Sequence, residues 1–550
     1  MENQIIEITD LTLKLNKAVL INNISLNIKR GHITGLVGES GSGKTMTALS
    51  MLRLLPPGID IHTGTIRFNS SDGSFYPLES IPENILNRIR GNKIAMIFQE
   101  PMTSLNPSIT CGKQIMEAII RHKPVGRKEA LEQTLELLDE MKLPDPSRIF
   151  KAWPHQLSGG QRQRIMIAMA LSTNPEMLIA DEPTTALDVT VQKSILDLLN
   201  HLGAKYNLSI LFITHDLMVL KQIADDIIVM QQGEIVESGS EEKILCQPEK
   251  TYTKALIACK PKLEGNPARL PTIASLTGST FERAEKKQSF PEKAPCIPLL
   301  TVQNLNVTYF SGRRKSTQAV KNVSFEVYEG ETLGLVGESG SGKTTIGRTV
   351  LRLIEANSGK ILYRGMNLTR MPEKEIRTLR KNFQIVFQDP YSSLNPRFTI
   401  GRMLREPMDI HNIGKSREER LAFIEHLMGQ VGLEKDALNK YPHQFSGGQR
   451  QRIGIARALA CRPEFIILDE CVSSLDVSIQ AQILNLLNDL KLIYGLTYIF
   501  ISHDLTVVKY MSDRVIIMKS GEIIESGQTG QVYRNPEHEY TRKLIDAIPG

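Results

Sequence analysis

The 550-residue sequence predicts an α/β protein of two tandem domains, each with a parallel β core, an antiparallel β edge and a helical subdomain. The stretch WPHQLSGGQRQRI (153–165) returns as YPHQFSGGQRQRI (441–453), and Ser158 and Ser446 lie 446 − 158 = 288 residues apart. A glycine-rich loop between an apolar strand and a helix also occurs twice, and so does an apolar strand ending in Asp-Glu. Recurrence at a domain-sized interval means two copies of one domain.

Composition is that of an ordinary globular protein, with 41% hydrophobic and 23% charged residues. No apolar run approaches the roughly 18 to 20 residues needed to cross a bilayer. The start MENQIIEITD lacks the basic and apolar regions of a secretory signal. The six cysteines show no CxxC spacing, which favours isolated reduced thiols. We therefore expect a protein of the cytosol or of the cytosolic face of a membrane.

The chain divides into a first domain (1–250), a linker (251–298) and a second domain (299–550). Each domain should open with antiparallel edge strands, because residues 2–13 and 20–28 alternate apolar and polar side chains. Each should close with two strands joined by a tight glycine turn, as in DDIIVMQQGEIVESG. The linker is rich in proline and charge, which predicts a partly extended and partly flexible segment.

The glycine-rich loops match the pattern GxxxxGK[ST] between a strand and a helix. Backbone N–H groups of such a loop surround phosphate oxygens, and the helix N-terminus adds partial positive charge. The loop residues of the two copies are Gly38, Glu39, Ser40, Gly41, Ser42, Gly43, Lys44 and Thr45, and Gly337, Glu338, Ser339, Gly340, Ser341, Gly342, Lys343 and Thr344. We expect each lysine to bridge the terminal phosphates of a nucleoside triphosphate and each final threonine to bind Mg²⁺.

After the loop, each copy has a buried strand that ends at a glutamine, Gln99 or Gln388. The first copy carries about ten extra residues before this strand, and 69–80 (NSSDGSFYPLES) is expected to be that insertion, as a surface loop. Residues 112–142 and 401–432 predict amphipathic helices, in which Leu131, Leu135 and Leu138 would face a helical core.

The repeated Ser-Gly-Gly-Gln stretch opens a further helix, and a serine with small residues at a helix start predicts a second anion-binding surface. Its residues are Ser158, Gly159, Gly160 and Gln161, and Ser446, Gly447, Gly448 and Gln449. The strands that follow end in Asp181-Glu182 and Asp469-Glu470. In a phosphate-loop protein the first acid holds the Mg²⁺ shell and the second polarises an attacking water. His215 and His503, at matching strand ends, fit γ-phosphate sensing better than a structural role.

With these motifs all in order, both halves resemble ATP-binding cassette (ABC) ATPases, whose cassettes combine a P-loop core of the RecA type with an antiparallel edge and a helical subdomain. The resemblance implies ATP and Mg²⁺ as ligands and a head-to-tail pseudo-dimer within the chain, in which Ser-Gly-Gly-Gln of one cassette closes over ATP on the other. It implies that the catalytic residues are Glu182, Glu470, His215, His503, Gln99 and Gln388. It implies that the Mg²⁺ ligands are Thr45, Gln99, Asp181, Thr344, Gln388 and Asp469. An aromatic residue stacks on adenine in this family; Tyr309 or Phe310 can serve in the second copy, while the first copy has Leu15.

A narrower resemblance comes from FQEPMTSLNP (98–107), FQDPYSSLNP (387–396) and the tails around Tyr252 and Tyr540. These look like the ATPases of oligopeptide, dipeptide, nickel and glutathione importers. The resemblance implies two integral-membrane permease subunits and an extracytoplasmic solute-binding protein as partners. It places the chain peripherally on the cytoplasmic face of the inner membrane, with no nucleic acid expected as a partner.

Two other functions compete with membrane transport. A soluble two-cassette ATPase acting on ribosomes or nucleic acid would also lack membrane spans, but no zinc spacing or arginine-rich run supports it. A nucleotide-binding regulator without turnover is disfavoured by the two intact Asp-Glu pairs. We predict two hydrolytic sites that need not be equal.

Overall fold

The computed structural model describes residues 4–99, 104–185, 187–265, 267–276, 297–311, 315–473 and 475–548. Its contacts divide the chain into two compact units: residues 1–187 with 191–258, and residues 259–548 with 188–190. Of the described helices, none combines the length and apolar composition that a membrane span needs.

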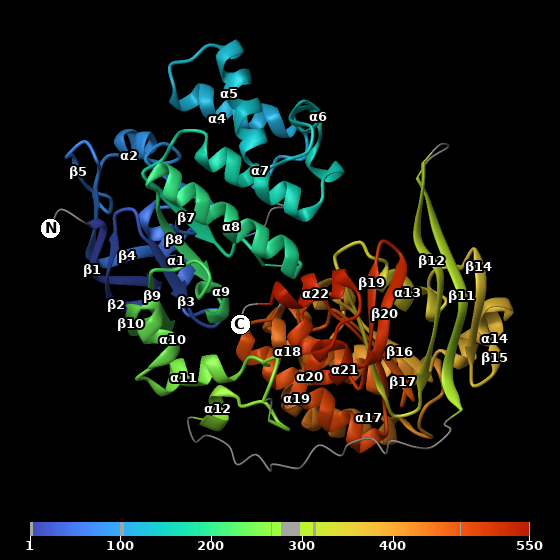
Figure 1. Cartoon of the computed structure of the whole chain (residues 1–550). Coiled ribbons are helices and arrows are strands. Elements are labelled where there is room, and N and C mark those ends of the chain that lie inside the picture. Colours follow the sequence, from blue (N-terminus) through green and yellow to red (C-terminus); the bar gives the residue numbers. More distant parts are fainter. Residues whose placement is uncertain are drawn as a thin grey trace. The chain divides into compact units, whose positions relative to one another are not determined.

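Two sheets build the first unit (Figure 1). The antiparallel sheet has the order β2-β1-β4-β5, from β1 (Gln4–Leu15), β2 (Ala18–Lys29), β4 (Ile59–Asn69) and β5 (Phe75–Pro77). The six-stranded sheet has the order β10-β9-β3-β8-β7-β6, from β3 (Ile33–Val37), β6 (Ile94–Ile97), β7 (Met177–Asp181), β8 (Ser209–Thr214), β9 (Asp226–Gln231) and β10 (Glu234–Ser240). Strands β9, β3, β8, β7 and β6 run parallel, and β10 pairs antiparallel with β9. The predicted edge strands and closing strand pair are confirmed.

The apolar runs of β3, β7 and β8 are buried along their whole length, as expected for central strands covered on both faces. Residues of both sheets join one core with helix α1, whose Ala48 and Met51 are completely buried. The helices of this unit are α1 (Lys44–Met51), α2 (Glu83–Ile89), α4 (Cys111–His122), α5 (Arg127–Glu140), α6 (Pro146–Lys151), α7 (Gly159–Leu171), α8 (Val189–Tyr206), α9 (Leu217–Leu220), α10 (Glu241–Cys246) and α11 (Thr251–Ala258). The carboxyl ends of the parallel strands consequently meet at the start of α1.

The predicted helical region is present as α4, α5 and α6, which gather on the side of the unit away from the antiparallel sheet (Figure 1). Only part of its expected core is correct. Leu138 is buried, whereas Leu131 on the same helix is 36% exposed. The surface of α5 thus carries an apolar side chain that the leucine spacing assigned to the interior.

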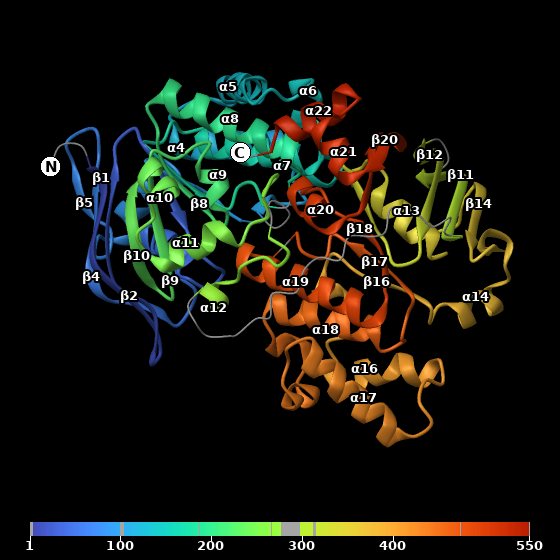
Figure 2. The ribbon, with the colours of Figure 1, turned by 60° about the horizontal axis from the view of Figure 1, so that its bottom comes forward.

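The second unit repeats this plan, with the sheet orders β12-β11-β14-β15 and β16-β17-β18-β13-β19-β20. Its strands are β11 (Pro298–Ser311), β12 (Lys315–Tyr328), β13 (Thr332–Gly337), β14 (Ser358–Tyr363), β15 (Met366–Asn367), β16 (Phe383–Val386), β17 (Phe465–Asp469), β18 (Thr497–Ile501), β19 (Arg514–Lys519) and β20 (Glu522–Gln528). Its described helices are α12 (Ile273–Leu276), α13 (Lys343–Val350), α14 (Glu373–Leu379), α15 (Pro390–Ser393), α16 (Ile400–Ile410), α17 (Arg417–Gln430), α18 (Gly447–Leu459), α19 (Val477–Tyr494), α20 (Leu505–Met511), α21 (Thr529–Arg534) and α22 (Glu539–Asp546). Helices α16 and α17 lie at one end of this unit, away from β11, β12 and β14 (Figure 2).

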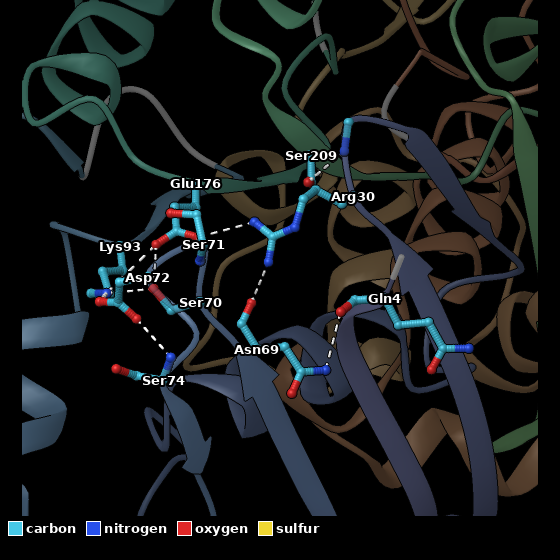
Figure 3. A network of polar contacts seen from close by, with 11 residues as sticks. Gln4, Arg30, Asn69, Ser70, Ser71, Asp72, Ser74, Lys93, Glu176 and Ser209 are labelled. Atoms are coloured by element: carbon cyan, nitrogen blue, oxygen red, sulfur yellow. Dashed lines mark hydrogen bonds and ion pairs between the residues drawn. The ribbon is translucent and has the colours of Figure 1, made fainter. Parts of the chain in front are cut away.

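The insertion at 69–80 differs from the predicted surface loop, because Phe75–Pro77 form strand β5 and pair antiparallel with β4. Its turn is held by the carboxylate of Glu176, which accepts from the Ser70 hydroxyl and the Ser71 N–H, each at 2.6 Å (Figure 3). Arg30 donates to the same carboxylate at 3.1 Å, and Lys93 forms an ion pair with it at 3.6 Å. The extra residues are thereby tied to the core.

The expected linker also begins with ordered structure. Residues 251–258 form α11, and α12 (Ile273–Leu276) follows. Residues 259–265 and 267–276, which we call the strap, belong to the second unit. Leu270 of the strap is 1% exposed within that unit's core, and the Asn485 side chain pairs with both backbone polar groups of Leu270, at 3.0 and 2.8 Å.

Candidate nucleotide site

Each phosphate loop turns from a parallel strand into a helix, β3 into α1 and β13 into α13. Gly38 must be glycine, because a Cβ there would lie 2.2 Å from the carbonyl oxygen of Met230. Gly43 caps α1 with φ 103°, a left-handed backbone that favours glycine. Gly337 and Gly342 repeat both features in the second unit. The tight path of the loop thus depends on its glycines.

Inside the first loop, the Lys44 ammonium donates to the carbonyls of Gly38 and Glu39, each at 2.8 Å. The Ser42 hydroxyl is buried and has no hydrogen-bond partner among the described residues. A buried lysine, a partnerless hydroxyl and the uncapped start of α1 together provide donors for a polyanion. The loop therefore fits the phosphates of a nucleotide.

The acid pairs lie at the carboxyl ends of β7 and β17. Asp181 is 2% exposed and accepts from the Thr45 hydroxyl at 3.3 Å; in the second unit Thr344 donates to Asp469 at 2.9 Å. Burial raises the pKa of Asp181 to about 6, against the lowering effect of Thr45. A carboxylate beside a threonine hydroxyl supplies the oxygen ligands that Mg²⁺ prefers, so this pair fits the metal as well.

The neighbouring glutamate is held differently. Glu182 accepts from Thr185 at 2.9 Å and lies 3.2 Å from Nδ1 of His215. Burial by itself would raise the pKa of Glu182, but the hydrogen bond and charge of His215 lower it to about 2. Burial likewise opposes the charge on His215, yet the hydrogen bond to Glu182 raises the pKa of that histidine. Glu182 is therefore ionised next to a histidine that favours its protonated form.

The second unit keeps the Glu470–His503 pair at 3.3 Å and changes its surroundings. Gln388 donates to the Glu470 carboxylate at 2.8 Å, whereas Gln99 is an exposed residue just after β6. Ser473 takes the position of Thr185 and donates to the backbone carbonyl of Glu470. The two sites therefore differ in the contacts that hold their glutamates.

The Ser-Gly-Gly-Gln stretches begin α7 and α18, each with a capping box. Ser158 Oγ accepts from the Gln161 N–H at 3.3 Å, while Gln161 Oε1 accepts from the Ser158 N–H at 3.1 Å. Ser446 and Gln449 repeat this exchange at 3.4 and 3.0 Å. The motif therefore has a structural role within its own unit, in addition to the anion-binding surface predicted for it.

The candidate adenine residues lie on the edge sheets. Tyr309 in β11 is 44% exposed, and its hydroxyl lies 3.3 Å from that of Thr345, next to the second loop. Leu15, at the end of β1, is 38% exposed. An aromatic ring offers a stacking face that leucine lacks, so the two units present different surfaces to a base.

Sequence reasoning gave no role to the tail tyrosines. The Tyr252 hydroxyl accepts from the backbone N–H of Glu39, and the Tyr540 hydroxyl accepts from that of Glu338. The available signal was their spacing, because the two tyrosines are separated by the same 288 residues as the motifs.

Comparisons with known proteins agree with this geometry. The family model described as ABC transporter matches residues 21–185 and 320–473. The model described as oligopeptide/dipeptide transporter, C-terminal region, matches residues 236–288 and 524–550. The chain therefore belongs to the ABC transporter family and is an ATPase with two ATP-binding cassettes. Its C-terminal regions are those of the oligopeptide/dipeptide transporter group.

Individual relatives match along nearly the whole chain. The glutathione import ATP-binding protein GsiA of Salmonella typhimurium is 45% identical over 540 residues, covering 96% of this chain and 86% of that protein. Its counterpart from Pectobacterium atrosepticum is 42% identical over 565 residues, covering 100% and 90%. A solved dimeric bacterial ABC transporter cassette is 30% identical and covers 42% of this chain and 98% of its own, with a TM-score of 0.39. The two import proteins and the transporter family models do not support the alternative of a ribosome or nucleic-acid factor.

Proposed function

We propose that the chain energises the import of peptides or related small solutes, with glutathione as the best-supported solute and dipeptides, oligopeptides or nickel as the others. The observation that carries this proposal is the match of two complete cassettes, along almost the full chain, to proteins named for glutathione import. Two integral-membrane permease subunits and an extracytoplasmic solute-binding protein would be its partners. It would bind peripherally to the cytoplasmic face of the inner membrane.

Two cassettes, residues 1–250 and 299–550, would close head to tail over two ATP molecules. One composite site combines Lys44, Thr45, Gln99, Asp181, Glu182 and His215 with Ser446, Gly448 and Gln449. The other combines Lys343, Thr344, Gln388, Asp469, Glu470 and His503 with Ser158, Gly160 and Gln161. Tyr309 would stack on the adenine of the second site. Each γ-phosphate completes contacts between cassettes, and its loss after hydrolysis releases them, which is a two-state switch able to do work.

Mg²⁺, held by Thr45 and Asp181 in one cassette and Thr344 and Asp469 in the other, would neutralise phosphate charge when bound. The chain's own groups do the rest. Lys44 compensates the phosphates, and Glu182, kept ionised by His215, orients and polarises the attacking water. The different glutamate contacts in the two units support unequal turnover at the two sites.

A groove on the second unit supports the permease contact. A cavity of about 230 Å³ lies between β16, α16 and α18, with both apolar and charged walls. Its lining includes Phe387, Met403, Glu406, Pro407, Ile410 and Arg457. Ile410 is 55% exposed, and an apolar side chain beside charged groups is typical of a protein-binding surface.

The test is a mild-detergent pull-down of the tagged chain from its own cells. Recovery of two multi-span permease subunits is expected, and recovery of ribosomes or DNA-repair proteins without membrane proteins would overturn the proposal. Ile410→Asp should reduce permease recovery because it places a charge in the groove. Leu421→Asp is the matched control, since Leu421 is 49% exposed on α17 and does not line the groove.

A further inference from the structure

The two tail helices bring one tyrosine each to the phosphate loops. Tyr252 on α11 is 4% exposed, and its hydroxyl lies 3.3 Å from the Glu39 nitrogen. Tyr540 on α22 is 7% exposed, and its hydroxyl lies 3.4 Å from the Glu338 nitrogen. The same contact occurs in both units although loop and tail are more than 200 residues apart in sequence. Preservation of this contact in both copies of the domain argues against an accidental contact.

Each tail is itself anchored by a carboxylate of the closing strand pair. Glu237 on β10 accepts from the backbone N–H groups of Glu249 and Lys250, at 2.7 and 3.3 Å, at the start of α11. Glu525 on β20 accepts from the N–H groups of Glu537 and His538, at 3.0 and 3.2 Å, at the start of α22. A negatively charged carboxylate near a helix N-terminus also interacts favourably with the helix dipole. Each tyrosine therefore lies on a helix whose start is held in place by hydrogen bonds to the closing strand pair.

The peptide unit between Gly38 and Glu39 contacts both the tyrosine and the phosphate-loop lysine, because its N–H donates to Tyr252 and its carbonyl, that of Gly38, accepts from Lys44 Nζ at 2.8 Å. While the Glu39 N–H donates to Tyr252, the Glu39 carbonyl accepts from Lys44 Nζ at 2.8 Å and from the Ser42 N–H at 3.1 Å. In the second unit the Glu338 carbonyl accepts from Lys343 Nζ at 3.0 Å and from the Ser341 N–H at 3.1 Å. A continuous row of hydrogen bonds therefore joins tyrosine, loop backbone and lysine, and such rows strengthen each other.

We propose that Tyr252 and Tyr540 are positioning residues for ATP binding: each hydroxyl holds the entrance of the phosphate loop in the conformation that presents Lys44 or Lys343 to the phosphates. The proposal rests on the proposed role of these loops as the nucleotide sites. It gives the C-terminal region of each cassette a function in nucleotide affinity. Binding and tail order are then linked in both directions, because a coupling free energy is reciprocal.

The main test compares the purified full-length double variant Tyr252→Phe/Tyr540→Phe with Tyr533→Phe. Both keep their buried rings, but the Tyr533 hydroxyl donates to the Leu505 carbonyl at 2.7 Å and touches neither loop. The double variant should raise the Kd for ATP about fivefold at each site, the effect of one ordinary hydrogen bond, and should raise KM more than it lowers kcat. A Kd within twofold of wild type, or an equal rise in Tyr533→Phe, would overturn the proposal.

Hydrogen exchange supplies a second readout that general destabilisation does not reproduce. ATP should slow amide exchange in residues 251–258 of the wild type and of Tyr533→Phe, and this protection should be lost in Tyr252→Phe. Equal protection in Tyr252→Phe would contradict the coupling. The double variant Lys44→Ala/Lys343→Ala distinguishes failure of the proposed nucleotide sites from failure of the tyrosine proposal. If ATP binding survives in this variant, the loops are not the nucleotide sites. If ATP binding is lost in this variant but unchanged in the tyrosine variants, only the role of the tyrosines is refuted.

Discussion

In each cassette the surroundings shift the pKa values of two adjacent carboxyl groups in opposite directions. Burial raises the pKa of Asp181 to about 6. Burial would also raise the pKa of Glu182, the next residue, but the hydrogen bond and charge of His215 lower that pKa to about 2. Glu182 and Glu470 also adopt φ of 46° and 47°, a left-handed backbone that is costly for a non-glycine residue. Strain of this kind, kept at both sites, agrees with a functional demand on the glutamate.

Replacing these glutamates removes the negative charge while keeping the shape of the side chain. We expect Glu182→Gln or Glu470→Gln to lower hydrolysis at its own site by about two to four orders of magnitude, with ATP binding retained, because the water loses its general base. Single-turnover hydrolysis and ATP binding are the measurements. Glu132→Gln, the same change on the exposed face of α5, should leave both unchanged. Normal turnover in the double variant would refute the assigned role.

Motif spacing was sufficient to predict that an Asp-Glu pair lies beside each phosphate loop, since the carboxyl ends of parallel strands meet at one edge. It could not predict that Gln388 contacts Glu470 while Thr185 contacts Glu182. Those contacts depend on side-chain rotamers and on neighbours from distant strands. The tyrosine contact was likewise hidden, because nothing local to Tyr252 indicates that α11 reaches Glu39.

Among the elements, the pair α7 and α8 depends on one glycine of the Ser-Gly-Gly-Gln motif. A Cβ at Gly160 would lie 2.6 Å from Val191 Cγ1, and one at Gly448 would lie 2.4 Å from Ile479 Cγ2. At Gly159 the nearest atom would be at an ordinary 3.5 Å. The second glycine therefore permits a close helix contact, whereas the first does not.

Alanine variants of the two glycines therefore test the packing role of the second glycine. Gly160→Ala should destabilise the first unit by about 1–3 kcal/mol because the helices must separate, and Gly159→Ala should not. Thermal unfolding is the measurement, and Val191→Ala in the same chain should recover part of the loss. Equal stability of the two glycine variants would show that the helices accommodate the methyl group freely.

The hairpin β4–β5 is a second element whose stability depends on a single carboxylate. Burial opposes the charge of Glu176, but hydrogen bonds from Ser70, Ser71 and Arg30 lower its pKa below the usual 4.5 (Figure 3). Its stabilising contribution is therefore complete above pH 4.5 and is lost as the pH falls through the lowered pKa.

Glu176→Gln should accordingly lower the unfolding temperature of the first unit between pH 5 and 8, by an amount corresponding to about 1–3 kcal/mol. The difference from wild type should shrink as the pH falls below 4.5 and through the lowered pKa, because wild-type Glu176 then also becomes neutral. Glu464→Gln, at the matching position of the second unit, is the control. Glu464 is 47% exposed, so its loss should matter less. A difference that grows at low pH would contradict the pKa direction.

At the scale of the whole molecule, composition alone did not reveal the contacts of the strap with the second unit. Proline and charge mark 251–298 as a linker, yet the strap contributes Leu270 to the core and Arg269 to a two-point contact with Asp489 at 2.7 and 2.9 Å. The Tyr510 hydroxyl donates to the Ala268 carbonyl at 3.1 Å. Such contacts are long-range and side-chain specific, so local composition does not reveal them.

Leu270→Asp would place a charge in this core, and we expect the second unit to lose about 2–5 kcal/mol of unfolding free energy. Leu276→Asp is the control, because Leu276 lies in the same strap and is 44% exposed. Denaturant unfolding, followed by hydrogen exchange in α19 and α20, measures the effect. Unchanged exchange in both helices would show that the strap is not required there.

The strap also determines how the protein can be divided into pieces. A recombinant second cassette that starts at residue 297 would lose both hydrogen bonds between Asn485 and Leu270 and uncover the apolar surface beneath Leu270. One that starts at residue 259 would carry that cover with it. A soluble second half is therefore expected from the longer fragment, whose first residue directly follows α11, the last helix of the first unit.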